Sequence, residues 1–328
     1  MTTAERIACV GAGRMGRGMA IAFAYAGMPV NLIDLKARSP EAWAQLSAEA
    51  RAEVRSSLQL LSQLGAVPAD AVERIAARIT LVPDAEADAA LAAATVIFEG
   101  VPETLDAKRE ALARVCAAAS ADAIIASTTS TILVTDLVPL VTQPERLINA
   151  HWLNPAYIIP LVELSVHEAT AAAVRQRLST LLQGIGKQTV ECGPAPGYIV
   201  PRLQALIMNE AARMVEEGVA TAEDIDKATR YGLGLRFAAM GVVEFIDFGG
   251  NDILYHASRY LSRTLGKERY TAPAIVDRMM AEGRNGLKSG QGFYDYRGID
   301  VAAYRLDVLQ RTLGMLRHAG QFKPPVTE

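Results

Sequence analysis

Three glycines near the N-terminus, Gly11, Gly13 and Gly16, have the spacing of a turn that holds the phosphates of a nucleotide. In such a turn the first glycine permits a tight bend, the second leaves room for a pyrophosphate, and the third lets a helix pack closely on a sheet. The free N–H groups and the dipole of that helix attract the anion. Asp34 follows Gly16 by 18 positions, where a carboxylate can accept hydrogen bonds from both hydroxyls of a ribose. These residues therefore indicate the binding of a dinucleotide.

The acid at position 34 also indicates which dinucleotide is bound. A carboxylate there repels a 2′-phosphate, so NAD is predicted rather than NADP. Lys36 and Arg38 are near enough to hold a phosphate, but we interpret both as solvated charges at the start of a helix. The predicted cofactor contacts in this region are Gly11, Gly13, Arg14, Met15, Gly16 and Asp34.

A second set of residues could move a proton. His151 stands at the end of an apolar run, and Glu163 follows it by twelve positions. If Pro155 and Pro160 bracket a reversal of the chain, the imidazole and the carboxylate reach hydrogen-bonding distance. The carboxylate then fixes the tautomer and stabilises the protonated ring, which suits a general base that takes a hydroxyl proton while a hydride leaves. A half-buried histidine satisfied by a structural acid explains the spacing equally well.

The elements that must position these residues alternate between strands and helices in the first half of the chain. Apolar runs predict buried strands, and segments with an apolar residue every three or four positions predict helices. Strands are predicted at residues 7–10, in a run ending at 34, and at 78–82, 94–99, 123–126, 146–152, 161–166 and 188–192, with helices after the glycine turn and at 41–65, 68–78, 105–119 and 171–186. This alternation is typical of an α/β fold with a doubly wound sheet of the Rossmann type.

The pattern changes at residues 193–197, where glycine and proline cluster. We place a domain boundary there, with an NAD-binding Rossmann domain at 1–193 and an all-helical substrate and dimerisation domain at 194–328. Helices are predicted at 202–217 and at 221–231, the second with Thr221 as its N-cap. Apolar runs at 203–208 and 238–248 are expected to meet a second subunit in a homodimer. The polar tail from residue 319 is expected to be loosely ordered.

Composition narrows the class of protein. The 328 residues are 51% hydrophobic and 21% charged, which suits two folded domains rather than a disordered chain. The net charge of −3, without a basic block, argues against a nucleic-acid partner. No apolar segment reaches the ~18–20 residues that span a bilayer, and the polar start indicates no signal peptide. We expect a cytoplasmic enzyme with no membrane partner and no metal site, whose three cysteines, Cys9, Cys116 and Cys192, are buried free thiols.

Several motifs occur in the order typical of the L-3-hydroxyacyl-CoA dehydrogenase family, which the chain resembles from about residue 5 to residue 296. They are the glycine turn, Pro102-Glu103-Thr104 with Lys108, the run at 127–131, the His-x-x-Asn-Pro motif at 151–155, Glu163, Pro196-Gly197-Tyr198-Ile199-Val200, and the run at 286–294. The resemblance implies a Rossmann domain joined to a helical dimerisation domain. It also implies His151 as the base, Glu163 as its partner, Ser130 hydrogen-bonded to the substrate hydroxyl, and Glu103 and Lys108 near the cofactor and the substrate entrance.

Pro201 departs from the family pattern. The family has an asparagine at this position, and its side chain helps to position the substrate carbonyl. Proline is tolerated in the first turn of a helix, where the missing N–H has no partner, but it removes that contact. Asn209, two helical turns further on, is a candidate substitute. The change leaves open whether another group replaces the asparagine or the substrate differs from the usual thioester.

A second departure is the run at 232–241, which contains Arg236 where the thioester enzymes have a proline-rich run. Here the chain is similar to L-gulonate 3-dehydrogenase and carnitine dehydrogenase, relatives that act on free acids. A guanidinium can hold a carboxylate with two parallel hydrogen bonds, so Arg236 is predicted as a substrate contact. A salt bridge or a place at the dimer seam explains this arginine equally well. Asn154 is a further predicted substrate contact.

The expected activity is NAD-dependent hydride transfer at C3 of a 3-hydroxy acid, as a small free carboxylate or as its CoA thioester. One alternative is a strict 3-hydroxyacyl-CoA dehydrogenase, for example acting on 3-hydroxybutyryl-CoA. Another, of a different class, is an NAD(H)-binding sensor or structural protein with little catalysis. The intact set of Ser130, His151 and Glu163 argues against the latter.

Overall fold

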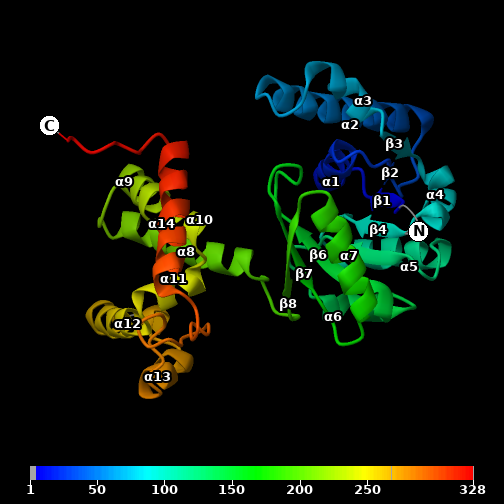
Figure 1. The fold of residues 1–328 in the computed structure, drawn as a ribbon. Coiled ribbons are helices and arrows are strands. Elements are labelled where there is room, and N and C mark those ends of the chain that lie inside the picture. Colours follow the sequence, from blue (N-terminus) through cyan, green and yellow to red (C-terminus); the bar gives the residue numbers. More distant parts are fainter. Residues whose placement is uncertain (1–4, 267, 328) are drawn as a thin grey trace. The chain divides into compact units, whose positions relative to one another are not determined.

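The computed structural model describes residues 5–266 and 268–327 (Figure 1). Contacts between Cα atoms divide the chain into two compact units, Met1–Ile207 and Met208–Glu328. The division falls within helix α8 (Val200–Glu216). The domain boundary after residue 193 stays a prediction.

The first unit is built on a sheet whose eight strands lie in the order β3-β2-β1-β4-β5-β6-β7-β8. Neighbouring strands are parallel except for β6 and β7, which are antiparallel. The strands are β1 (Ile7–Val10), β2 (Val30–Ile33), β3 (Ile79–Val82), β4 (Val96–Glu99), β5 (Ile124–Ser127), β6 (Leu147–Trp152), β7 (Leu161–Ser165) and β8 (Gln188–Cys192). The strand order reverses between β1 and β4, which is where open α/β sheets bind their ligands. The prediction of a doubly wound α/β fold is confirmed.

Helices cover both faces of this sheet because successive side chains of each buried strand point to opposite faces. Ile7 and Cys9 of β1 pack on one face with α1 (Arg14–Tyr25), α2 (Pro40–Gln63), α3 (Val72–Ala76) and α7 (Ala172–Gly184). Ala8 and Val10 pack on the other face with α4 (Ala87–Ala93), α5 (Leu105–Ala118) and α6 (Val134–Leu137). The short 3₁₀ turns are η1 (Ala69–Ala71), η2 (Asp84–Glu86), η3 (Val138–Leu140) and η4 (Pro144–Arg146).

The sequence pattern misses helices α4 and α6 because each is too short to show a period. Helix α4 buries only Ala87 and Leu91 in its seven residues. The segment at 68–78, expected to be one helix, is η1 followed by the short helix α3. It ends at Ala76 because the chain becomes extended at Ile79, where strand β3 pairs with Val30 of β2.

The three cysteines are free. Cys9 is fully buried, and this burial raises the pKa of its thiol to about 12, so it is an inert core residue. Cys116 and Cys192 are half-buried, less enclosed than expected.

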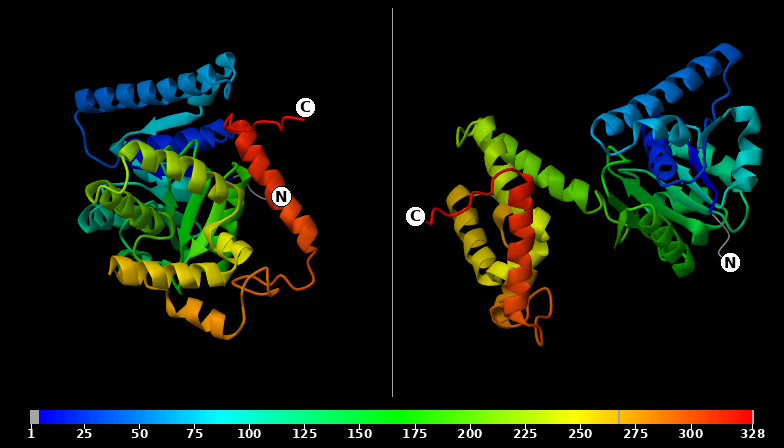
Figure 2. Two further views of the ribbon diagram at one scale, coloured as in Figure 1. Left: turned by 90° about the vertical axis from the view of Figure 1, so that its left-hand side faces the viewer. Right: turned by 45° about the horizontal axis from the view of Figure 1, so that its top comes forward.

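The regular elements found in the second unit, within residues 208–266 and 268–327, are all helical, as predicted (Figure 2). After α8 come α9 (Ala222–Ala228), the π-helical turn η5 (Thr229–Gly234), α10 (Leu235–Ala239), α11 (Val242–Gly249), α12 (Asn251–Leu265), η6 (Glu268–Tyr270), α13 (Ala274–Ala281) and α14 (Val301–His318). Helix α10 packs against α14, and α12 packs against α13. The hydroxyl of Thr221 accepts the N–H of Asp224 at 3.1 Å, which confirms the predicted N-cap. The helix expected at 221–231 is shorter, since it widens into η5 after Ala228.

A buried carboxylate organises the run at 286–294. Asp247 of α11 accepts the N–H groups of Phe293 and Tyr294 at 3.0 and 2.8 Å and is closed to solvent. A Cβ at Gly292 would lie 2.1 Å from its Oδ1, so only glycine fits there. Helix α14 ends at His318, and residues 321–327 form no regular element. Within the described residues, no helix combines the length and the apolar character needed to cross a membrane.

Candidate functional site

The glycine turn has the geometry that its sequence predicts. Gly11, with φ +101°, follows strand β1, and a Cβ there would lie 2.6 Å from the carbonyl oxygen of Gly100. A Cβ at Gly16 would lie 2.0 Å from the carbonyl oxygen of Gly11, so a hydrogen atom alone fits where α1 meets the turn. At Gly13, by contrast, a Cβ would find no atom within 4 Å. That open space, directly before the N-terminus of α1, suits a pyrophosphate.

A cavity of about 740 Å³ opens from this turn. Gly11, Gly13, Arg14, Met15 and Asp34 of the predicted cofactor contacts are among its lining residues. Its volume is in the range of ~300–1,000 Å³ that ligand pockets occupy, and it lies at the switch point of the sheet. The lining therefore fits the pyrophosphate and the neighbouring ribose of NAD.

Asp34 and Arg38 form an ion pair at the ribose end of this cavity. The Asp34 side chain is 7% exposed, and the Nε of Arg38 donates a hydrogen bond to its Oδ2. Arg38 is exposed, as expected for a solvated charge, but it lies in the loop after strand β2 and also pairs with Asp34. Lys36 is exposed, as expected.

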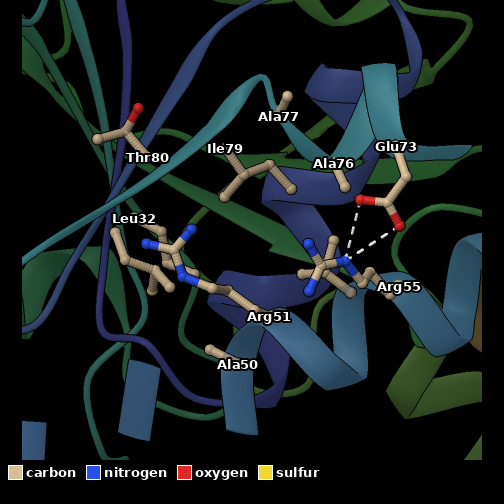
Figure 3. Close-up of a pocket in the computed structure, with 11 residues that line it drawn as sticks. Leu32, Ala50, Arg51, Arg55, Glu73, Ala76, Ala77, Ile79 and Thr80 are labelled. Atoms are coloured by element: carbon tan, nitrogen blue, oxygen red, sulfur yellow. Dashed lines mark hydrogen bonds and ion pairs between the residues drawn. The ribbon is translucent and has the colours of Figure 1, made fainter. Parts of the chain in front are cut away.

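A second, smaller cavity of about 350 Å³ lies beside strands β2 and β3 and helices α2 and α3 (Figure 3). Arg55 and Glu73 form an ion pair at this cavity, with 3.1 Å between the Nε and the carboxylate oxygens. It shares no lining residue with the larger cavity and contains none of the predicted site residues. The cofactor fingerprint therefore belongs to the larger cavity alone.

His151 and Glu163 face each other on the antiparallel strands β6 and β7. The Nδ1 of His151 lies 2.8 Å from the Oε2 of Glu163, so the predicted contact is confirmed. Glu163 is fully buried, and its Oε1 accepts the N–H groups of Ile199 and Val200 at 2.9 and 2.8 Å. An ionised carboxylate can only accept, which places the proton of a neutral imidazole on Nδ1 and leaves the lone pair on Nε2.

Tyr198 covers one face of the His151 ring, a contact that the sequence reasoning did not assign. The two rings are stacked, with centroids 4.8 Å apart and an interplanar angle of 15°. The Tyr198 hydroxyl donates to the carbonyl of Thr129 at 2.8 Å and accepts from Nδ2 of Asn149 at 3.2 Å. Burial raises the pKa of this hydroxyl well above its usual value, so it stays protonated. In the sequence, the position of Tyr198 directly after Pro196-Gly197, within a family motif, is the only indication of this role.

Glu103 holds the loop that carries Ser130. Its Oε1 accepts the backbone N–H groups of Ser130 and Thr131 at 2.9 Å each, and also the hydroxyls of Thr129 and Thr131. Although partial burial favours the neutral acid, the hydrogen bonds from Thr129 and Thr131 and the charge of Lys108 lower the pKa of Glu103 to about 2. The Ser130 residue itself is exposed, and its hydroxyl has no hydrogen-bond partner among residues 5–266 and 268–327.

Lys108 is buried beneath this loop rather than exposed at a binding surface. Its side chain is 1% exposed, and its Nζ lies 3.0 Å from Oε2 of Glu99 and 3.6 Å from Oε2 of Glu103. Glu99 also accepts the hydroxyl of Ser127 at 2.6 Å. The sequence alone predicts no role for Glu99, although an acid at the end of a buried strand indicates a residue with a specific partner. Lys108 is thus linked to the Ser130 loop through Glu103.

The turn that carries Asn154 is fixed by Lys187. The Nζ of Lys187 donates to the carbonyls of Ala156 and Ile159 at 2.6 and 2.8 Å and lies 5.3 Å from the centroid of Trp152. Burial lowers the pKa of this ammonium group. Asn154 itself is exposed, and its contact with substrate stays a prediction.

The remaining predicted substrate residues belong to helix α8 and to the second unit. Pro201 stands in the first turn of α8, where its missing N–H has no role, as expected. Asn209 and Arg236 belong to the second unit, and both are exposed. Arg236 forms no ion pair with any described residue, and its guanidinium lies 5.6 Å from the ring centroid of Phe245.

Comparison with known proteins places this site in a family. The sequence model of the 3-hydroxyacyl-CoA dehydrogenase NAD-binding domain matches residues 6–195, and that of the C-terminal domain matches residues 197–296. The 3-hydroxyadipyl-CoA dehydrogenase of Escherichia coli is 32% identical over 97% of this chain, and the chain spans 64% of that protein. The L-carnitine dehydrogenase of Streptomyces coelicolor is 35% identical over 87% of this chain and 91% of its own.

Solved structures agree. The 3-hydroxyacyl-CoA dehydrogenase of Archaeoglobus fulgidus matches with a TM-score of 0.76 and 29% identity, over 97% of this chain and all of its own. Two adjoining family domains, a glycine turn shaped for a pyrophosphate and a histidine paired with a buried glutamate thus occur in one chain. The chain belongs to the 3-hydroxyacyl-CoA dehydrogenase family of NAD-dependent oxidoreductases.

Proposed function

We propose that this protein oxidises the secondary alcohol at C3 of a 3-hydroxy acid, or of its CoA thioester, and catalyses the reverse reduction, with His151 as the general base. The observation that carries the proposal is the 2.8 Å contact between Nδ1 of His151 and the buried carboxylate of Glu163. Two backbone N–H groups and the imidazole all donate to this carboxylate, so its position and its orientation are both fixed. A fixed acceptor defines both the orientation and the tautomer of the imidazole.

The chain's own residues then have distinct tasks. The Ser130 hydroxyl donates to or accepts from the substrate alcohol, and Nε2 of His151 takes the proton of that alcohol. Glu163 stabilises the positive charge that the imidazole acquires. Such general-base assistance contributes about 10²–10⁴-fold to the rate. When bound at the glycine turn, NAD supplies the acceptor for the hydride that leaves C3.

Two observations favour a free carboxylate over the thioester. A CoA ester needs cations for its phosphates, and Lys108, the cation that the family resemblance places near the substrate entrance, is 1% exposed and engaged with Glu99 and Glu103. Arg236 makes no ion pair with a described residue, so its guanidinium is available to hold a carboxylate through two hydrogen bonds. The L-carnitine dehydrogenase among the relatives is consistent with this substrate class. The 3-hydroxyadipyl-CoA dehydrogenase keeps the thioester as the competing candidate.

The experiment is a comparison of NAD reduction by the purified protein with two sets of substrates. One set contains 3-hydroxyacyl-CoA esters of increasing chain length, and the other contains 3-hydroxybutyrate, L-gulonate and carnitine. Turnover of free acids alone, with a KM that rises in Arg236→Gln, supports the carboxylate assignment. Turnover of thioesters alone leaves Arg236 a structural residue, and an inactive His151→Ala variant supports the proposed base with either set.

We also propose a cytoplasmic homodimer. Leu203, Leu206, Ile207 and Met208 of helix α8 are each 44–60% exposed, which is unfavourable for a cluster of large apolar side chains in water. A two-fold contact between copies would bury them. Free cysteines are in keeping with a reducing compartment. Size-exclusion chromatography with light scattering measures the mass of the protein in solution. The mass of a monomer at micromolar concentration would contradict the dimer.

A further inference from the structure

Tyr198 lies between the two groups that the proposed reaction needs on the substrate alcohol. Its ring is stacked on His151, with centroids 4.8 Å apart. Its hydroxyl reaches the other way and donates to the carbonyl of Thr129, the residue directly before Ser130. Tyr198 is 7% exposed, so both contacts are shielded from water.

Asn149 completes the link to the Ser130 loop. This fully buried side chain, on the same strand as His151, donates from Nδ2 to the Tyr198 hydroxyl at 3.2 Å and to the carbonyl of Ile132 at 3.1 Å. The carbonyls of residues 129 and 132 are thereby anchored on either side of Ser130. Glu103 holds the N–H groups of the same loop, so the loop is fixed from two directions.

The backbone around Tyr198 indicates that this placement is enforced. Among the described residues, Tyr198 alone combines a side chain with a positive φ, of 45°. Such a conformation is uncommon for a bulky residue and persists only where the surroundings determine it. The two residues that follow, Ile199 and Val200, donate their N–H groups to Glu163. One short segment thus fixes the His151 ring from its face, through Tyr198, and from its edge, through Glu163.

We propose that Tyr198 is a positioning residue that holds the Ser130 hydroxyl and the His151 imidazole in one fixed arrangement around the substrate alcohol. This inference rests on the proposed function. The ring sets the plane of the imidazole, and the hydroxyl sets the position of the loop. Phenylalanine at this position would keep the stacking but leave the Nδ2 of Asn149 and the carbonyl of Thr129 without this partner.

The test is a pair of double-mutant cycles measured as kcat/KM for the alcohol substrate, because coupled residues give non-additive effects. Tyr198→Phe should lower kcat/KM about tenfold, the loss expected from unpaired buried groups. In a Ser130→Ala background the same change should cost less than about twofold, because it acts through Ser130. Tyr198→Leu, which also removes the stacked ring, should lower kcat further, and this extra loss should vanish in a His151→Ala background.

Controls separate positioning from a general structural effect. Tyr25→Phe removes another tyrosine hydroxyl that donates to a carbonyl, that of Ala66 at 3.1 Å, far from the site in the sequence. It should leave kcat/KM unchanged, and all variants should keep the wild-type Kd for NADH. Wild-type kcat/KM in Tyr198→Phe, or effects that simply multiply in both cycles, would overturn the inference. Undiminished turnover in His151→Ala would instead refute the proposed function itself.

Discussion

Glu163 and His151 are opposite each other in the register of two antiparallel strands, and a contact of 2.8 Å joins the carboxylate to Nδ1. The pair predicts unequal effects for its two members. His151→Ala removes the base and should lower kcat by about 10³-fold or more. Glu163→Gln keeps the imidazole but removes the negative charge of its partner, and should lower kcat by about 10²-fold. NADH titration should give wild-type affinity for both. Glu191→Gln, on the neighbouring strand β8, is the control.

Lys108 and Glu99 form a buried salt bridge that should contribute to stability. Lys108→Met leaves the Glu99 carboxylate without its cation in the protein interior, which should lower the free energy of unfolding by about 3–5 kcal/mol. Arg109→Met, one residue further on, breaks an exposed pair with Asp106 and should cost less than about 1 kcal/mol. Urea denaturation measures both. Equal losses would show that Lys108 is not held as the structure describes.

The sequence predicts the sheet, the glycine turn and the His151–Glu163 contact because each depends on short-range patterns. Buried strands are continuous apolar runs, and two prolines are enough to indicate the reversal between β6 and β7. The register then places residues 151 and 163 opposite each other. These features need no knowledge of side-chain partners from distant parts of the chain.

The partners of charged side chains could not be predicted in the same way. Lys108 pairs with acids on a strand and on a loop, and whether a lysine turns inward depends on packing that no local pattern encodes. Arg38 likewise pairs with Asp34 only because the chain bends back after strand β2. Tyr198 contacts residues 47 and 69 positions away in the sequence, His151 and Thr129. Such long-range contacts become visible only once the fold is known.

Glu103 should make the free energy of unfolding depend on pH in the acidic range. Its pKa is about 2 in the folded protein against an ordinary value of 4.5. A carboxylate with a lowered pKa contributes its full stabilisation above pH 4.5 and loses it as the pH falls towards 2. Because the side chain is 36% exposed, solvent screening limits this contribution to about 1 kcal/mol. Glu103→Gln should therefore destabilise at pH 7 by about that amount.

The measurement for Glu103 is urea unfolding of wild type and Glu103→Gln at pH 7, 5, 4 and 3. The difference between the two proteins should be constant from pH 7 to 5 and should shrink below pH 4.5. Glu110→Gln, at an exposed position on helix α5, is the matched control. A difference that stays constant down to pH 3 would show that the Ser130 loop does not depend on the charge of Glu103.

The Asp34–Arg38 pair should control the choice between NAD and NADP. Asp34→Ser removes the carboxylate that repels a 2′-phosphate and releases the guanidinium of Arg38 to bind it. A charge-assisted hydrogen bond of that kind is worth about 10- to 100-fold, so the ratio of kcat/KM for NADP to that for NAD should rise by this factor. Adding Arg38→Gln should reverse most of the gain, and Lys36→Gln should not. A gain independent of Arg38 would assign the effect to lost repulsion alone.

Gly13 and Gly16 should separate cofactor binding from folding. At Gly13 a methyl group meets no atom within 4 Å, so Gly13→Ala should fold with an unchanged Tm. The same methyl group occupies the space for the pyrophosphate and should raise the Kd for NADH at least about tenfold.

At Gly16 the Cβ would lie 2.0 Å from the carbonyl oxygen of Gly11, and such overpacking costs about 1–3 kcal/mol. Gly16→Ala should therefore lower Tm by several degrees. Thermal melting and fluorescence titration with NADH measure the two properties, and wild-type NADH affinity in Gly13→Ala would place the pyrophosphate elsewhere.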